Sequence, residues 1–156
     1  MRYQDQIVRR TQSALDDVIR AAKAIPSDKV DWSPGGAARS TLAQMREIAQ
    51  TGDRFLPLIA GDAHIFEGHA AREEAAANGT EGLDDLVSEA RSGVARLCQA
   101  IMAIPDEDLE GEITLPFGGG MVMTLADALG LPAWNMTYHL GQINQIGLIL
   151  GDRRMH

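Results

Sequence analysis

The chain has 156 residues, enough for one domain with a core of its own, and 45% of them are hydrophobic, as in globular proteins. Aromatic residues make up only 4%, which favours packed helices with an aliphatic core over a β-sandwich. The net charge of −8 disfavours binding to nucleic acids and to anionic membrane surfaces, so neither is expected as a partner.

Apolar residues recur at the spacing of amphipathic helices in four long segments. Proline or glycine follows each of them, which marks where a helix stops. The predicted helices span residues 4–25, from Ser40 or Thr41 to about 61, 82–103, and from Thr124 to about 150. The expected fold is therefore an all-α four-helix bundle that forms a single domain over residues 1–156.

Local signals refine three of these helices. Thr41 and Gln44 fit a capping box, in which each side chain bonds a backbone N–H at the start of the second helix. Pro57 predicts a kink in that helix, and Pro132 a bend in the fourth. Residues 62–81 are expected to form a long crossover with a short helix near 70–77, and the loop 106–123 to hold a brief extended pair.

The two halves of the chain contain similar sequences in the same order. "AIPSDKV" at 24–30 resembles "AIPDEDL" at 103–109, and "SPGGAARSTLAQ" at 33–44 resembles "LPFGGGMVMTLAD" at 115–127. Each copy runs from a helix through an Ala-Ile-Pro stop and a glycine-containing loop to a Thr-Leu-Ala helix start. The pattern predicts two helix–loop–helix units with a pseudo-two-fold relation.

The N-terminal sequence "MRYQDQIVRR" has no apolar core and does not resemble a signal peptide, and the apolar run "FLPLIAG" is too short to span a bilayer. The single cysteine, Cys98, excludes an internal disulfide and a cysteine-based zinc cluster, and its helical spacing is that of a core residue. These features favour the cytoplasm as the compartment.

Polar residues on the last helix are the first candidates for function. Asn135, His139 and Gln142 follow one another at offsets of four and three, so they share one face of a helix otherwise rich in Met, Leu and Ile. A histidine in a bundle interior can bind a metal, although a single histidine is more often a hydrogen-bonded core residue.

Other candidates are weaker. Glu47 lies at the edge of an apolar stripe, where it either reaches solvent or pairs with Arg46 or Arg54. His64 and His69 share no helix face and are expected to be solvated. The chain has no P-loop, HExxH, GxSxG or Rossmann motif, so these patterns identify no catalytic residue.

The closing helix "YHLGQINQIGLILGD" resembles that of the DinB-like (DinB/YfiT-like) superfamily, and so do the "DKVDWSPGGAARSTLAQ" helix entry and the "IPDEDL" turn. The resemblance covers nearly the whole chain. It implies a four-helix bundle with a long crossover between the second and third helices, usually a homodimer. Many members bind a divalent metal through three histidines, one on the second helix and two, four apart, on the last.

Carried over by position, the three histidines correspond to Glu47, Asn135 and His139, so the histidine triad is altered at two positions. Glutamate and histidine are good ligands for zinc, nickel, manganese or iron, whereas asparagine is a weak one. In the other interpretation Glu47 and Asn135 hydrogen-bond His139 and the site holds no metal.

Two functions follow from the resemblance. One is a metal-dependent enzyme that acts on a small molecule, similar to relatives that use a metal to activate a low-molecular-weight thiol for transfer. The other is a non-catalytic dimeric bundle with a degenerate metal site, which binds a small ligand or a partner. The sequence assigns no catalytic residue to either.

Overall fold

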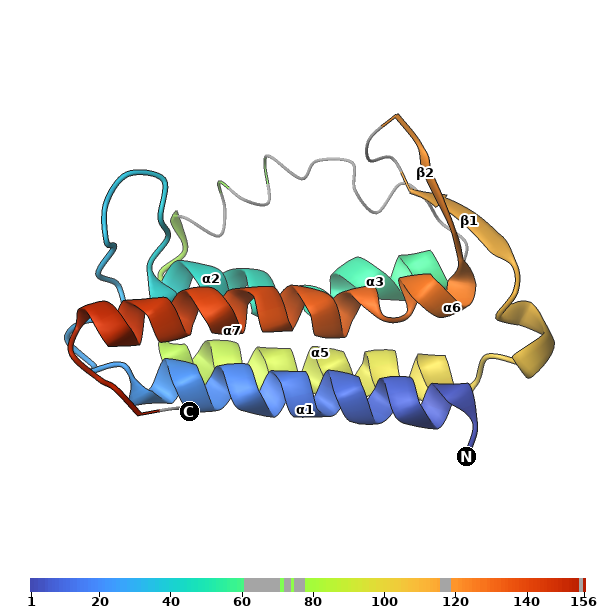
Figure 1. Cartoon of the computed structure of the whole chain (residues 1–156), viewed down its shortest axis with the longest axis horizontal. Coiled ribbons are helices and arrows are strands. Elements are labelled where there is room, and N and C mark those ends of the chain that lie inside the picture. Colours follow the sequence, from blue (N-terminus) through green and yellow to red (C-terminus); the bar gives the residue numbers. More distant parts are fainter. Residues whose placement is uncertain (61–70, 72–73, 75–77, 116–118, 155) are drawn as a thin grey trace.

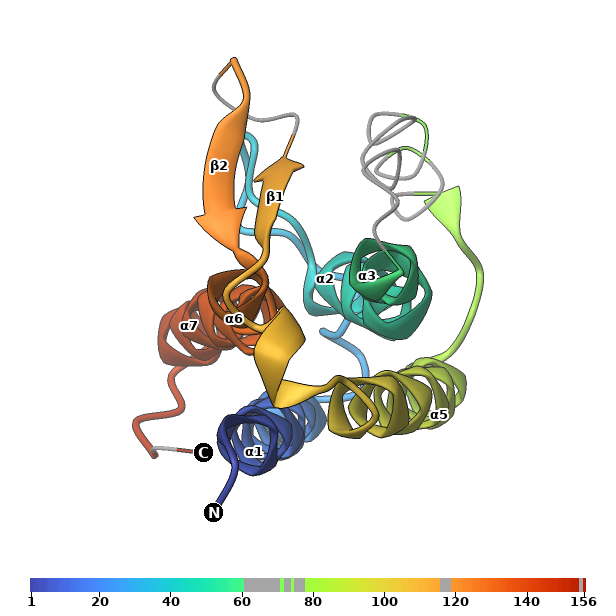
Figure 2. The same ribbon diagram turned by 90° about the vertical axis from the view of Figure 1, so that its right-hand side faces the viewer.

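The computed structural model describes residues 1–60, 71, 74, 78–115, 119–154 and 156. It is an all-α bundle of four helical columns, which Figure 2 shows nearly end-on. The first and third columns are single helices, while the second and fourth are each built from two helices in line (Figure 1). The columns are α1 (Tyr3–Ala24), α2 (Thr41–Ala49) with α3 (Thr51–Ile59), α5 (Leu83–Met102), and α6 (Leu125–Ala128) with α7 (Leu131–Ile149).

The connection between the third and fourth columns carries the predicted extended pair. After a 3₁₀ turn, η2 (Asp106–Asp108), strands β1 (Glu112–Leu115) and β2 (Met121–Thr124) pair antiparallel, with Glu112 opposite Thr124. Residues 60–82 connect the second column to the third. The short helix expected near 70–77, together with His64 and His69, lies largely or wholly outside the described residues.

Two predicted bends lie elsewhere than expected. The second column breaks at Gln50, which ends α2 and begins α3, and Pro57 lies within α3. The fourth column breaks at Leu129 and Gly130, and Pro132 lies in the first turn of α7. The first turn tolerates proline because its N–H groups have no intrahelical acceptor, so Pro132 helps to start a helix rather than bend one.

The predicted capping box at Thr41 is wrong by one residue. Ser40 is the N-cap, and its hydroxyl accepts a hydrogen bond from the Ala43 N–H at 3.1 Å. Gln44 does not reach back to the cap residue's N–H. Its amide oxygen lies 3.2 Å from His139 Nδ1, and its amide nitrogen donates to the Arg39 carbonyl at 3.3 Å. The Gln44 side chain is therefore directed toward α7. In the other half, Thr124, the predicted start of the fourth helix, is the N-cap of α6, and its hydroxyl accepts a hydrogen bond from the Asp127 N–H.

The bundle core is aliphatic, as the low aromatic content predicts. Every column contributes side chains that are fully buried or nearly so, and they include Val18, Met45, Ile48, Ala90, Leu97, Ile101, Met136 and Ile143. Within the described part of the chain, no helix has the length and apolar character needed to cross a membrane.

A close crossing of α3 and α5 fixes the second and third columns against each other. A Cβ atom added at Gly52 would lie 2.4 Å from the Gly93 carbonyl carbon, well inside van der Waals contact. A Cβ atom added at Gly93 would be less crowded, because it would lie 3.5 Å from the Gly52 Cα. The crossing therefore requires glycine at position 52 more strictly than at position 93.

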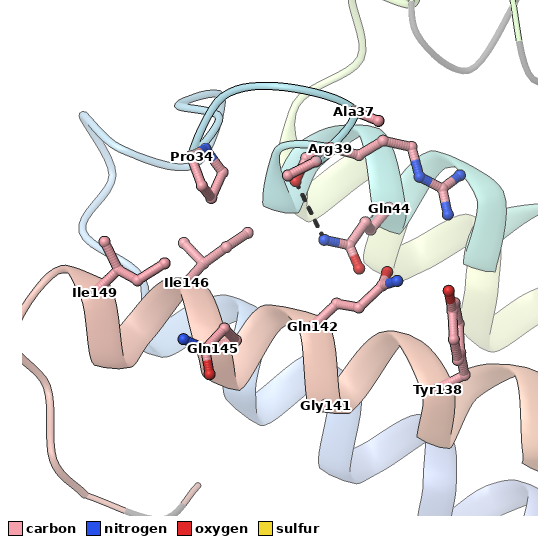
Figure 3. A pocket seen from close by; sticks show the side chains of 11 residues that line it. Pro34, Ala37, Arg39, Gln44, Tyr138, Gly141, Gln142, Gln145, Ile146 and Ile149 are labelled. Atoms are coloured by element: carbon pink, nitrogen blue, oxygen red, sulfur yellow. Dashed lines mark hydrogen bonds between the residues drawn. The ribbon is translucent and has the colours of Figure 1, made fainter.

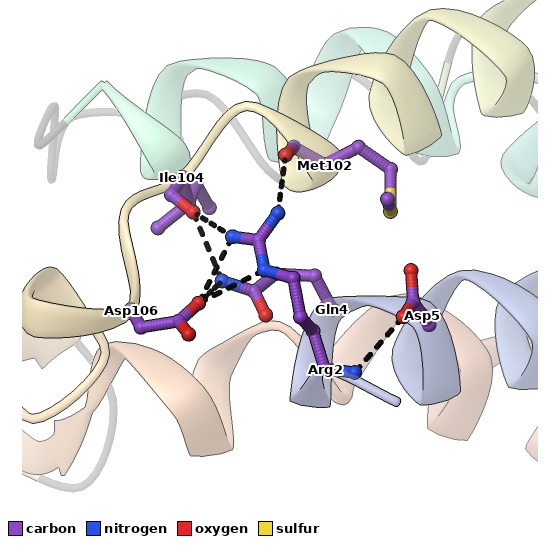
Figure 4. A network of polar contacts seen from close by, with 6 residues as sticks. All are labelled: Arg2, Gln4, Asp5, Met102, Ile104 and Asp106. Carbon is purple, nitrogen blue, oxygen red and sulfur yellow. Dashed lines mark hydrogen bonds and ion pairs between the residues drawn. The ribbon is translucent and has the colours of Figure 1, made fainter.

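The start of α1 is tied to the turn that follows α5 (Figure 4). The buried Gln4 amide donates to the Ile104 carbonyl and to the Asp106 carboxylate, each at 2.9 Å. The Arg2 guanidinium also bonds both groups. The hydrogen bonds from Gln4 and Arg2 hold the pKa of Asp106 below its ordinary value of 3.8.

The lowered pKa of Asp106 predicts a pH-dependent contribution to stability. A carboxyl whose pKa is lowered by folding stabilises the fold above its unfolded pKa and loses this contribution as the pH falls through the folded pKa. We therefore expect Asp106→Asn to be less stable than wild type near neutral pH, with the gap narrowing below about pH 3.8. Urea denaturation across this range measures the gap, and Glu107→Gln, an exposed neighbour, controls for the loss of one charge. A gap independent of pH would contradict the expectation.

Candidate functional site

Two rows of polar residues face each other inside the bundle. Gln44, Glu47, Thr51 and Arg54 follow at offsets of three, four and three, so one buried row runs from α2 into α3. The facing row on α7 is Asn135, His139 and Gln142. Each row lies on one helix face because residues three or four apart are neighbours on a helix surface.

Glu47 is the centre of the first row, and its side chain is only 9% exposed. One carboxylate oxygen accepts a hydrogen bond from Arg39. The other oxygen, Oε1, accepts from Arg54 Nη1 at 3.2 Å and lies 3.3 Å from His139 Nε2. Two guanidinium groups and an imidazole thus converge on one buried carboxylate.

These contacts determine the charge state of Glu47. Burial by itself would raise the pKa of its carboxyl, but the contacts with His139 and Arg39 outweigh that effect. They hold the pKa of Glu47 well below its usual range, so the group is a carboxylate at neutral pH.

His139 is 1% exposed, and both of its ring nitrogens lie near oxygen atoms of the α2 segment. Nδ1 is 3.2 Å from the Gln44 amide oxygen, a hydrogen bond in which the ring nitrogen donates. The contact of Nε2 with Glu47 is an ion pair by distance, but its alignment falls short of a hydrogen bond.

Asn135, the third predicted ligand, lies one turn before His139 on α7 and is half-buried. Its amide nitrogen is buried and has no hydrogen-bond partner among the residues that the structure describes. The structure therefore brings Glu47 and His139 together, while Asn135 makes no hydrogen bond with either of them within that part of the chain.

One distance fits a metal ion. Two ligands of a tetrahedral zinc site lie about 3.3–3.5 Å apart, given metal–ligand distances of about 2.0–2.2 Å. Glu47 Oε1 and His139 Nε2 match this separation at 3.3 Å. The charges do not fit, because the carboxylate is already neutralised by Arg39 and Arg54. Over the described ranges, no three His, Cys, Asp or Glu side chains are grouped so as to hold a metal.

A pocket of about 410 Å³ opens beside this cluster, between the loop before α2 and the outer side of α7 (Figure 3). Arg39 and Gln44 line it and also contact Glu47 and His139, so they separate the pocket from the buried pair. Figure 3 shows the Gln142 side chain pointing from α7 toward the α2 segment. The remaining lining residues are Pro34, Ala37, Ala38, Tyr138, Gly141, Gln145, Ile146 and Ile149.

Sequence reasoning placed Glu47 and His139 but missed two of their partners, Gln44 and Arg39. The Arg54 pairing was one of the alternatives considered, whereas Arg46 pairs with Glu81 at 3.4 Å instead. Gln44 could have been found from its offset of three from Glu47. Arg39 lies in a loop outside the helical period, so no spacing signal marks it.

A model described as the DinB superfamily matches residues 10–143, which is most of the chain. The chain belongs to the DinB superfamily. Comparison with curated protein sequences found no significant match.

Solved structures share the fold. YfiT from Bacillus subtilis, described as "a probable metal-dependent hydrolase with an unusual four-helix bundle topology", has a TM-score of 0.78 at 13% identity, over 95% of this chain and 87% of YfiT. The DinB-like protein YjoA from Bacillus subtilis has a TM-score of 0.69 at 21% identity, over 97% of this chain and 95% of YjoA.

A third relative is larger than this chain. The mycothiol-dependent maleylpyruvate isomerase has a TM-score of 0.72 at 14% identity, over 90% of this chain but only 60% of the isomerase. At these identities the likeness concerns the fold. The confirmed expectations are thus the four-helix bundle, its long crossover and the superfamily.

Proposed function

We propose that this DinB-superfamily protein binds a small molecule with a carboxylate group in the pocket between the loop before α2 and α7. The observation that carries the proposal is the charge of the lining. The chain has a net charge of −8, yet among the described residues that line the pocket Arg39 is the one with a formal charge. A positively charged pocket on an acidic protein favours an anionic ligand.

The pocket has the size and the polar groups for such a ligand. Its volume of about 410 Å³ lies within the range of small-molecule sites. The Arg39 side chain is 33% exposed, so a ligand can reach it while its contact with Glu47 persists. A guanidinium recognises a carboxylate through paired N–H donors, and Gln142 and Tyr138 supply further hydrogen-bonding groups.

A second candidate is the divalent-metal-dependent enzyme, similar to thiol transferases, that the family resemblance implies. The 3.3 Å separation of Glu47 Oε1 and His139 Nε2 favours it. The two guanidinium groups on the same carboxylate oppose it. We therefore place the ligand-binding function first. The homodimer implied by the resemblance stays a prediction.

Replacement of Arg39 tests the carboxylate site. We expect aliphatic or aromatic carboxylates to bind wild type better than their uncharged amides do. Arg39→Gln should weaken carboxylate binding by about 1.5–3 kcal/mol, roughly tenfold to a hundredfold in Kd, because a charge-assisted hydrogen bond is lost. Calorimetric titration of protein that has been freed of metals with EDTA and then dialysed free of the chelator measures this, and Arg39→Lys should retain part of the affinity.

The matched control is Arg20→Gln, which removes an exposed arginine of α1 that pairs with Asp17. This variant should bind the same carboxylates as wild type does. If amides bind as tightly as carboxylates, or if Arg39→Gln and Arg20→Gln behave alike, the proposed function is wrong.

A further inference from the structure

The side chains around Glu47 carry a net positive charge, unlike the ligands of a metal site. A metal site supplies negative or neutral ligands to a cation. Among the residues that the structure describes, a single carboxylate faces two guanidinium groups, Arg39 and Arg54, so these three side chains carry a net charge of +1. A divalent cation would raise this to +3 where the Glu47 and Arg54 side chains are each only 9% exposed. Burying several like charges together is strongly unfavourable.

The carboxylate oxygen that a metal ion would need is already bonded to Arg54. An ion bound between Glu47 Oε1 and His139 Nε2 would share that carboxylate oxygen with Arg54 Nη1, which lies 3.2 Å from it. Both side chains that hydrogen-bond Glu47 are arginines, whose charge is permanent in proteins. Neither releases a proton to make room for a cation.

We propose that the guanidinium groups of Arg39 and Arg54 replace the metal ion in this member of the superfamily, so that the centre is metal-independent and requires an anion to balance it. The inference deepens the proposed function and rests on it for the source of that anion. A ligand carboxylate at Arg39 would bring the charge of this group from +1 to zero. The Asn135 amide nitrogen, which has no hydrogen-bond partner in the described part of the chain, agrees with this, since a nitrogen donor is no ligand for a cation.

Metal titration of protein freed of metals with EDTA tests the inference without any activity assay. The probes are Zn²⁺, Ni²⁺ and Mn²⁺, read as shifts of the thermal midpoint, and Co²⁺, read by its visible absorption when bound. Wild type should show neither a shift nor cobalt absorption. Arg54→Met, which frees Glu47 Oε1 and removes one charge, should gain about tenfold or more in metal affinity. Arg54→Lys, which keeps the charge, should gain little.

Two results of the metal titration would overturn the inference. Stoichiometric metal binding by wild type overturns the inference, and so does a folded Arg54→Met that gains no affinity over wild type. If Arg54→Met does not fold, the partly exposed Arg39 is easier to remove. Arg39→Gln removes the same charge and should also gain metal affinity, but less, because Arg54 still bonds Glu47 Oε1; a folded Arg39→Gln that gains none then overturns the inference. Carboxylate binding is measured on the same metal-free protein after the EDTA has been removed. Its failure would therefore contradict the proposed function while the metal titration still decides the role of the arginines.

Discussion

Glu47→Gln should destabilise the protein by about 3–5 kcal/mol, the cost of removing one partner of a buried ion pair. Glutamine keeps the size of the side chain but leaves the guanidinium groups of Arg39 and Arg54 facing each other without a counter-charge. His139 would also lose the carboxylate 3.3 Å from its Nε2. Urea denaturation at pH 7 measures the loss, and EDTA in the buffer should leave it unchanged if no metal is involved.

Glu81→Gln is the control for this variant. It removes the carboxylate beside the buried Arg46, but Glu81 is itself half exposed, so the change should cost no more than about 1 kcal/mol. If Glu47→Gln loses no more stability than Glu81→Gln, the Glu47 carboxylate does not stabilise the fold through its contacts with Arg39, Arg54 and His139. Such a result would weaken both the proposed function and the inference about the arginines.

Gly52→Ala should cost about 3 kcal/mol, at the upper end of what overpacking does, because the added Cβ would lie 2.4 Å from Gly93 backbone atoms. Backbone atoms cannot move aside as a flexible side chain can, so α3 and α5 must separate. The gain in helix propensity from glycine to alanine, about 1 kcal/mol, offsets only part of this. Thermal or urea denaturation checks the prediction.

Gly93→Ala is the matched comparison at the same crossing. Its Cβ would lie at an ordinary contact distance of 3.5 Å from the Gly52 Cα. The propensity gain then predicts a neutral or slightly stabilising change. Equal losses for the two variants would show that the helices do not cross as closely as described.

The proposed site depends on how the second column is divided. The break at Gln50 separates α2 from α3, yet the polar row continues from Gln44 and Glu47 into Arg54. The two helices therefore present one row to α7. Because Gly52 lies between Glu47 and Arg54 in the chain, its close crossing with α5 also helps to hold the position of Arg54.

Several features of this protein followed from its sequence. Helical periodicity predicted the four columns, and the proline and glycine stops predicted their ends to within a few residues, because these signals act locally. The resemblance to the superfamily pointed to Glu47, Asn135 and His139, of which the structure brings Glu47 and His139 together. The break at Gln50 did not follow from the sequence, because Gln50 carries no strong local signal, whereas Pro57 does. In the fourth column the break lies at Leu129 and Gly130, just before the predicted bend at Pro132.

The tertiary structure alone decided what surrounds the carboxylate. The Glu47 and His139 side chains are 92 positions apart in the chain, and their approach depends on how α2 packs against α7. Arg39 reaches Glu47 from a loop, where no period relates one residue to another. Charge balance is a property of the groups that packing brings together, so the sequence could propose a metal site, whereas only the assembled bundle places two arginines on its carboxylate.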